Sequence, residues 1–347
     1  MLTSLVGSYP QPQWLLDREK LRGRQPPRIR AADFWRVDEA WLEEAQDAAT
    51  LMAIRDQERA GLDIVTDGEQ RRESYSNRVV MALGGVDLDA PGTTLDRSGN
   101  PFPVPRIVGP VTRSRPILLR DAEFLRANTA RLTKVTIPGP FTLAAQAQDD
   151  HYGSPRDVAF AFADVVRAEL EDLFAAGIDV VQLDEPWMES RADAAREYGI
   201  ETLARALDGV RGTTALHICF GYPLFVPGHQ RAYRFLGELA DAPVDQISIE
   251  TAQAELDLSV LAQLAGKTII LGVIALDTEE VESAETVEVR LRRALPYTRD
   301  LIAAPDCGMK YLSRESAFGK LQALVAGALR IDPGTSAQPP RSAEGGG

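Results

Sequence analysis

Short runs of apolar residues alternate along the chain with longer segments in which apolar residues recur every three or four positions. The short runs are typical of strands buried on both faces, and the longer segments of amphipathic helices. Eight runs are predicted as strands: Ser4–Ser8, Ile64–Asp67, Val135–Pro138, Val180–Asp184, Leu216–Cys219, Ile247–Glu250, Ile269–Val273 and Leu301–Ala304. Helical periodicity is clearest in four segments: Glu39–Ala60, Val158–Ala176, Thr286–Tyr297 and Ala317–Leu329. Eight strands that alternate with helices predict an α/β fold, the (β/α)8 TIM barrel.

Two regions interrupt the alternation. Residues 82–120 are rich in Gly, Pro and Asp, and we predict that they form a β-hairpin insertion after the second strand, with strands at 107–109 and 117–119. Residues 332–347 combine Pro, Ser and Gly and are predicted to be a disordered tail. The expected organisation is therefore a single catalytic barrel over residues 1–331, followed by this tail.

Composition narrows the class of protein. The chain has 38 basic and 51 acidic residues, a net charge of −13, which argues against nucleic acid or an anionic membrane surface as a partner. No apolar stretch approaches the length of a membrane span, and the N-terminus lacks the pattern of a signal peptide. Two cysteines do not suggest a disulfide scaffold. A cytoplasmic enzyme is expected.

Both cysteines lie at predicted strand ends that suit a metal. His217 and Cys219 alternate along one strand, so their side chains point to the same face. Glu250 and Cys307 end two further strands. Functional groups of a barrel collect at the C-terminal ends of its strands, and His, Cys and Glu are ligands of zinc. These four residues therefore predict a zinc site. The alternative is that the cysteines are small buried hydrophobes and His217 is a core histidine.

The other two histidines, His151 and His229, lie in polar stretches that contain Gly and Pro. They are interpreted as solvated loop residues. Because His229 follows the His-x-Cys strand closely, an indirect or proton-transfer role for it stays open.

Carboxylates end two more predicted strands, in Asp67-Gly68-Glu69 and Asp184-Glu185-Pro186. They could be solvated, could pair with the neighbouring Arg71 and Arg72, or could hold the ammonium group of an amino-acid substrate through Glu69 and Asp184. The turn Val6-Gly7-Ser8-Tyr9-Pro10 offers backbone N–H groups that could bind a carboxylate. No glycine-rich nucleotide-binding motif is present.

These motifs, in this order, resemble the catalytic half of cobalamin-independent methionine synthase. The matching stretches cover nearly the whole chain: Val6–Pro10, Asp67–Glu69, Ile137–Thr142, Gln182–Pro186, His217–Cys219, Ile249–Thr251 and Pro305–Lys310. The resemblance implies a (β/α)8 barrel and zinc held by His217, Cys219, Glu250 and Cys307. It also implies that homocysteine is held by Gly7 and Ser8 and by the acidic side chains of Glu69 and Asp184.

The chain departs from that family in two ways. Full-length members carry a second, N-terminal barrel that helps to bind folate, whereas this chain starts at the first catalytic strand and is similar to a short, core-only form. The family also places a proton-donating histidine just after the seventh strand. Residues 272–279 contain no histidine, and Asp277 is the nearest substitute.

The expected function is zinc-dependent transfer of a methyl group to the thiol of homocysteine, forming methionine. Methyl on folate N5 needs a general acid, whereas methyl on cobalt leaves without a proton, so a methylcorrinoid such as methylcobalamin is favoured over methyltetrahydrofolate. A protein that delivers the methyl group is a further expected partner. The alternatives are a zinc-dependent alkyltransferase or lyase acting on another thiol, such as coenzyme M, and a barrel without a catalytic metal.

Overall fold

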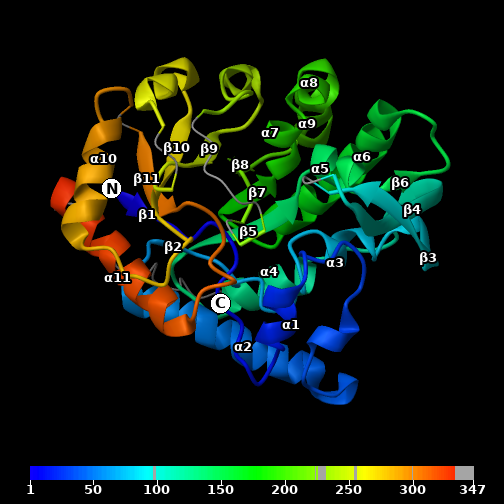
Figure 1. The fold of residues 1–347 in the computed structure, drawn as a ribbon, viewed down its shortest axis with the longest axis horizontal. Helices are drawn as coiled ribbons and strands as arrows, with labels where there is room; N and C mark the ends of the chain where they lie inside the picture. Colours follow the sequence, from blue (N-terminus) through cyan, green and yellow to red (C-terminus); the bar gives the residue numbers. More distant parts are fainter. Residues whose placement is uncertain (97–98, 223, 226–231, 254–255, 299, 333–347) are drawn as a thin grey trace, which may run out of the picture.

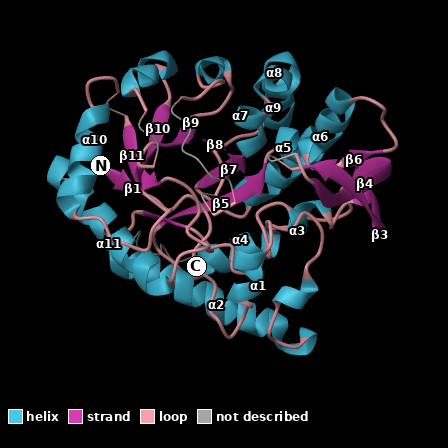
Figure 2. Cartoon of the chain, in the orientation of Figure 1, coloured by secondary structure: helices cyan, strands magenta, loops and turns pink. Residues whose placement is uncertain are grey.

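Eight parallel strands surround the centre of the molecule, and helices cover them on the outside, as Figure 1 and Figure 2 show. The computed structural model describes residues 1–332 except 97–98, 223, 226–231, 254–255 and 299. The barrel strands are β1 (Leu2–Thr3), β2 (Ile64–Val65), β5 (Leu132–Pro138), β7 (Val180–Asp184), β8 (Thr213–Ile218), β9 (Gln246–Glu250), β10 (Thr268–Ile274) and β11 (Leu301–Pro305). They pair in the order β1-β11-β10-β9-β8-β7-β5-β2. The predicted (β/α)8 barrel is confirmed.

The junction between β1 and β2 closes the barrel and differs from the other strand pairs. Its only bridge between the described residues is the isolated parallel pair Ser4–Ile64. Side chains supply further bonds: the backbone N–H and hydroxyl of Thr3 both donate to Asp63 at 2.8 Å. Above the bridge, Thr66 Oγ1 donates to the carbonyl of Gly7 at 2.7 Å. The first strand, Leu2–Thr3, is shorter than the predicted Ser4–Ser8 and lies just before it, with only Ser4 of the predicted run in a bridge. Further along, the backbone N–H of Tyr9 donates to the carbonyl of Gly68 at 3.0 Å, so this part of the junction is joined by isolated bonds and not by a continuous ladder.

The outer layer consists mainly of α2 (Glu39–Ala60), α4 (Leu119–Ala127), α5 (Pro140–Ala145), α6 (Pro155–Ala175), α7 (Pro186–Ser190), α8 (Ala192–Ala194), α9 (Ile200–Leu207), α10 (Ala284–Ala294) and α11 (Arg314–Ile331). Shorter helical turns are α3 (Asn77–Val80), η2 (Ala195–Gly199), η3 (Gly237–Asp241) and η4 (Leu258–Leu264). Serine N-caps fix the starts of three long helices: Ser154, Ser283 and Ser313 each accept a bond from a backbone N–H in the first turn. No helix in the described part of the chain is long and apolar enough to cross a membrane.

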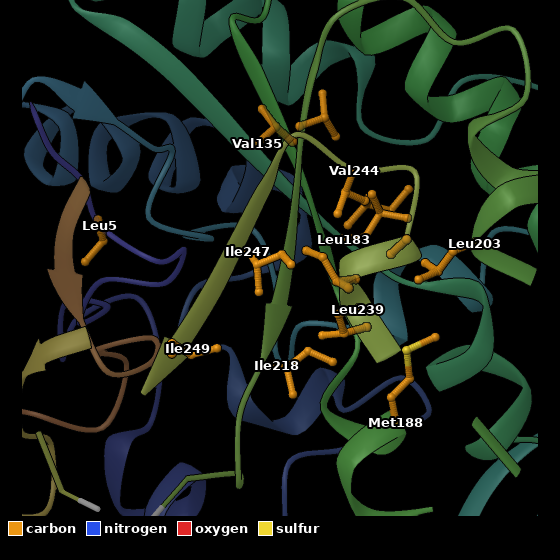
Figure 3. Close-up of a cluster of buried hydrophobic side chains, with 14 of the residues drawn as sticks. Leu5, Val135, Leu183, Met188, Leu203, Ile218, Leu239, Val244, Ile247 and Ile249 are labelled. Carbon is orange, nitrogen blue, oxygen red and sulfur yellow. The ribbon is translucent and has the colours of Figure 1, made fainter. Parts of the chain in front are cut away.

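The apolar core has two parts. Small and branched side chains fill the lower barrel interior, among them Val180, Ala215 and Ile270. A larger cluster joins the outward faces of the strands to the helices. Figure 3 shows Leu183, Ile218 and Ile247 of three successive strands within this cluster. The upper barrel interior is left for polar residues, which is where the site lies.

The insertion after the second strand is a hairpin, as predicted, but its strands differ from those predicted. β3 (Gly84–Leu95) and β4 (Pro101–Thr112) are antiparallel, and β6 (Gln148–Asp149) adds to β4. The predicted strand at 107–109 lies within β4. The predicted strand at 117–119 is wrong, because residues 117 and 118 form a bend and α4 begins at Leu119.

A segment before α2 covers one side of the barrel mouth. It contains α1 (Arg18–Gly23) and η1 (Ala32–Phe34), neither of which was predicted. Its side chains Leu21 and Phe34 pack in a small cluster with Tyr311, which follows β11. Arg22 donates to the carbonyl of Tyr311 at 2.7 Å, which ties the segment to the loop after Cys307. Of the tail predicted to be disordered (332–347), residues 333–347 lie outside the described residues.

Candidate functional site

Three of the four predicted metal ligands meet at the barrel mouth. His217 lies near the end of β8, Cys219 follows that strand, and Cys307 follows β11. One ligand atom from each lies within 4.8 Å of the other two, and all three residues are buried. The two Sγ atoms are 3.9 Å apart and are not joined in a disulfide. The arrangement presents one nitrogen and two sulfurs to a common point.

The chemistry of these groups fits a zinc ion. Two zinc–sulfur bonds of ~2.3 Å at a tetrahedral angle span roughly 3.8 Å. His217 Nδ1 lies 2.9 Å from the hydroxyl of Ser248, whereas the buried Nε2 has no hydrogen-bond partner among the described residues. A hydrogen bond to one ring nitrogen fixes the ring of a histidine ligand and leaves the other nitrogen for the metal. Contact with Cys219 and burial raise the pKa of Cys307 well above its usual value, so two thiolates here require a cation.

Glu250, the fourth predicted ligand, is not brought into this group of atoms. One of its carboxylate oxygens accepts from the backbone N–H of Phe220, and the other accepts from the amide of Gln253 at 3.1 Å. Burial, together with the charges of Cys219 and Asp306, raises its pKa well above the usual value. The carboxylate is thus next to the three ligands in the fold but is held by other partners.

The predicted ammonium-binding carboxylates lie in the same pocket. Glu69 adopts a left-handed backbone conformation (φ 54°), and its Oε1 accepts from Thr136 at 2.9 Å. Its Oε2 is buried without a hydrogen-bond partner among the described residues. Asp184 accepts from Gln182 at 2.8 Å, and burial raises its pKa to about 7. Both carboxylates can therefore receive a cationic group.

The neighbouring arginines do not occupy these carboxylates. Arg71 pairs with Asp47 and Asp121 on the outside of the barrel. Arg72 donates to the backbone carbonyl of Thr136 at 2.9 Å. No ion pair joins Glu69 to an arginine among the described residues, but, against the effect of burial, the charges of Asp67 and Glu69 raise the pKa of Arg72, so both interpretations of Glu69 stay open.

The Gly7–Ser8 turn packs tightly against the same groups. A Cβ on Gly7 would lie 2.7 Å from Glu69 Oε1 and 2.8 Å from Thr136 Cγ2, distances that real Cβ atoms do not adopt. Ser8 is buried. Glycine at position 7 therefore lets the first strand end approach the second, and the turn faces the pocket.

These residues line one pocket that is open to solvent, with a volume of about 950 Å³ when the open space at its mouth is included. Its inner part holds Gly7, Ser8, Glu69, Asp184, His217, Cys219 and Cys307. Its outer part is lined by the hairpin residues Thr94, Leu95, Asp96, Phe102 and Val104, and by Arg28, Tyr75, Trp187, Tyr222 and Phe225. The insertion thus forms a wall of the site.

The outer wall was not predicted from the sequence. Arg28 lies with its guanidinium 4.9 Å from the ring centre of Tyr75, but no local motif marked either residue. Asp277, the suggested substitute for the family's histidine, is exposed and does not line the pocket. His151 is exposed, which agrees with a loop histidine, and His229 lies outside the described residues.

Comparisons with known proteins agree with this geometry. Residues 1–329 match the family model described as the catalytic domain of cobalamin-independent synthase. The chain is 31% identical to a methionine synthase of Sulfolobus acidocaldarius over 332 residues, which covers 95% of this chain and 91% of the relative. It is 30% identical to a methionine synthase of Thermococcus kodakarensis, covering 94% and 91%.

Solved structures show the same likeness. A B12-independent methionine synthase from Shewanella sp. W3-18-1, in complex with selenomethionine, superposes with a TM-score of 0.86 at 33% identity, covering 95% of this chain and 97% of that one. A methyltransferase from Methanosarcina mazei shares the fold alone, with a TM-score of 0.63 at 16% identity. The chain belongs to the cobalamin-independent synthase family and is a methyltransferase of the methionine synthase type.

Proposed function

We propose that the protein transfers a methyl group to the thiol of homocysteine, forming methionine, with a zinc ion held by His217, Cys219 and Cys307. The observation that carries the proposal is that these three ligands and the carboxylates of Glu69 and Asp184 share one pocket. Glu250 is proposed as a fourth, displaceable ligand, since it is the last residue of β9, which lies between β8 and β11 in the barrel. The selenomethionine complex of the Shewanella relative supports a product of this class.

Bound zinc would lower the pKa of the substrate thiol and so supply a thiolate at neutral pH. The protein's own residues orient the rest of the amino acid. Glu69 Oε2 and the carboxylate of Asp184 receive the substrate ammonium in charge-assisted hydrogen bonds. The turn at Gly7 and Ser8 faces the substrate carboxylate. Since binding fixes three substrate groups, the sulfur is aimed at the methyl donor in the outer pocket.

The two carboxylates also decide between the proposed acceptor and other thiols. A thiol without an amino group, such as coenzyme M, gains nothing from two buried carboxylates and would be repelled by them if it carries an anionic group. The amino-acid acceptor is therefore ranked above alkylation of another thiol.

The donor is proposed to be a methylcorrinoid, with methyltetrahydrofolate as the alternative. Folate N5 must be protonated before its methyl group can leave, and His217 is the only histidine among the described residues that line the pocket. As a proposed metal ligand it is not available as that acid. The cobalamin-independent name of the family favours the folate alternative.

We propose that the reaction takes place in the cytoplasm.

The test is to incubate zinc-loaded protein with homocysteine and either methylcobalamin or methyltetrahydrofolate, and to measure methionine. Turnover that Cys219→Ser abolishes would support the proposed reaction. Methyltetrahydrofolate supporting turnover as well as methylcobalamin does would overturn the corrinoid assignment. Absence of methionine with both donors, in protein that contains zinc, would overturn the homocysteine assignment.

A further inference from the structure

Tyr222 reaches the inner pocket from a loop that the sequence motifs do not mark. It comes three residues after Cys219, and Gly221 between them has a φ of 97°, which residues with a side chain rarely adopt. This conformation turns the chain back, so that Tyr222 lines the pocket together with Ser8, Glu69 and Gly308. Nothing in the proposed mechanism yet uses it.

The ring of Tyr222 is held by aromatic contacts. It meets Tyr311 edge to face, with ring centres 4.7 Å apart and an interplanar angle of 74°. Tyr311 in turn contacts Phe225, with centres 5.2 Å apart. The backbone N–H of Phe225 donates to the carbonyl of Tyr222 at 2.9 Å, which closes the turn between them. The hydroxyl is therefore carried on a ring that is fixed by its aromatic neighbours.

The Tyr222 hydroxyl and the Ser8 hydroxyl converge on Gly308. A Cβ built on Gly308 would lie 3.2 Å from the Tyr222 oxygen and 2.2 Å from Ser8 Oγ. The backbone N–H of Met309 donates to the Ser8 carbonyl at 2.8 Å, which locks the two turns together. Ser8 is buried, and although burial raises the pKa of Tyr222, a hydrogen bond from the Ser8 side chain to the Tyr222 hydroxyl acts to lower it. Two hydroxyl groups thus face the pocket beside the Gly7–Ser8 turn.

A substrate carboxylate needs donors of this kind. On the proposed function, the substrate ammonium lies at Glu69 and Asp184 and its sulfur at the metal ligands, so the carboxylate must be placed away from both negative regions. A tyrosine phenol is protonated at neutral pH, so the Tyr222 hydroxyl can donate to a carboxylate. Arg28 is the one cation among the described lining residues and is the competing partner.

We propose that the hydroxyl of Tyr222, together with Ser8, binds the carboxylate of the amino-acid substrate and thereby selects α-amino acids over simple aminothiols. This inference rests on the proposed function, since it takes homocysteine and methionine as the ligands. It assigns to Tyr222 the role of a substrate-binding residue that acts mainly on affinity, because it touches the end of the substrate remote from the sulfur.

The test compares two ligands that differ only in the carboxylate, L-methionine and 3-(methylthio)propylamine. Their binding to the zinc-loaded protein is measured by calorimetry, without a methyl donor, for the unmodified protein and for Tyr222→Phe, Ser8→Ala and Arg28→Gln. Tyr297→Phe is the matched control, since Tyr297 lies on the surface and is 41% exposed. Zinc content is measured for each variant, so that metal loss is recognised directly.

Tyr222→Phe should weaken methionine binding by about tenfold to hundredfold, because it removes a hydrogen bond to a charged group. Binding of 3-(methylthio)propylamine should not change, and in turnover KM for homocysteine should rise while kcat is kept. Equal weakening of both ligands would overturn the inference, and so would loss of the carboxylate preference in Arg28→Gln alone. If the unmodified protein binds methionine and Tyr222→Phe binds it equally well, only this inference fails. If the unmodified protein neither binds methionine nor methylates homocysteine, the proposed function fails with it.

Discussion

The Sγ atoms of Cys219 and Cys307 lie 3.9 Å apart, although 88 residues separate them in the chain. They follow β8 and β11, which are not neighbours, because β9 and β10 lie between them in the barrel. The two thiols therefore meet across the mouth of the barrel rather than along one sheet edge. A cation at this point would join opposite parts of the strand ring.

Replacing Cys307 with serine should abolish tight zinc binding. The variant keeps the size of the side chain but loses one of two thiolate ligands, and structural thiolates contribute strongly to zinc affinity. Zinc per protein after dialysis, measured by mass spectrometry, is the readout, and Cys219→Ser should behave alike. Full zinc retention together with full activity in either variant would refute the assignment.

Replacing Ser248 with alanine should weaken zinc binding by about tenfold to hundredfold, the usual effect of removing a group that hydrogen-bonds a metal-binding histidine. The hydroxyl lies 2.9 Å from His217 Nδ1 and holds the ring with Nε2 toward the thiols. Competition with a chromogenic chelator gives the affinity. The matched control is Ser259→Ala, on the surface of η4, which should bind zinc as the unmodified protein does.

Removing the charge of Glu69 or Asp184 should raise KM for homocysteine. Each variant, Glu69→Gln and Asp184→Asn, loses a charge-assisted hydrogen bond worth about 1.5–3 kcal/mol, or roughly tenfold to hundredfold in affinity. The amino-free thiol 4-mercaptobutyrate should not lose affinity. The control is the exposed Glu123→Gln. An equal rise in KM for both thiols would show that the carboxylates act on the pocket in general and not on the amino group.

Replacing Gly7 with alanine should both destabilise the protein and impair substrate binding. The new methyl group meets Glu69 Oε1 at 2.7 Å and Thr136 Cγ2 at 2.8 Å, and such overpacking costs about 1–3 kcal/mol. Urea unfolding measures the loss of stability, and KM for homocysteine measures displacement of Glu69. Gly23→Ala is the control, because nothing lies within 4 Å of its Cβ position. Unchanged stability and KM in Gly7→Ala would contradict the close approach.

The periodicity of the sequence was sufficient to predict the barrel and to predict which residues meet in the inner part of the pocket. β7 spans Val180–Asp184 as predicted, and α2 spans Glu39–Ala60 as predicted. Strands buried on both faces leave continuous apolar runs, and their polar last residues mark the barrel mouth. For this reason His217, Cys219 and Cys307 could be placed together from sequence alone, whereas the role of Glu250 stays a prediction.

The strands of the hairpin and the residues of the outer pocket could not be predicted from the sequence. The strands of the insertion alternate poorly between polar and apolar residues, because both faces of β3 are largely exposed. Residues 117–119 are apolar but belong to the entry of α4, where a short run cannot distinguish strand from helix. Tyr222 reaches the pocket through a glycine turn and tertiary aromatic packing, neither of which leaves a periodic pattern.

Substrate binding should also stabilise the junction between β1 and β2. In its described part this seam has one isolated bridge, Ser4–Ile64, and one further backbone bond from Tyr9 to Gly68, but no continuous ladder, so it is the natural place for local opening of the barrel. Ser8 stands on one side of it and Glu69 on the other. An amino acid that contacts both residues would bind only the closed barrel, and its binding would therefore stabilise the closed form against local opening. Amide hydrogens of residues 3–9 should then exchange more slowly with methionine present, while those of β9 should not respond.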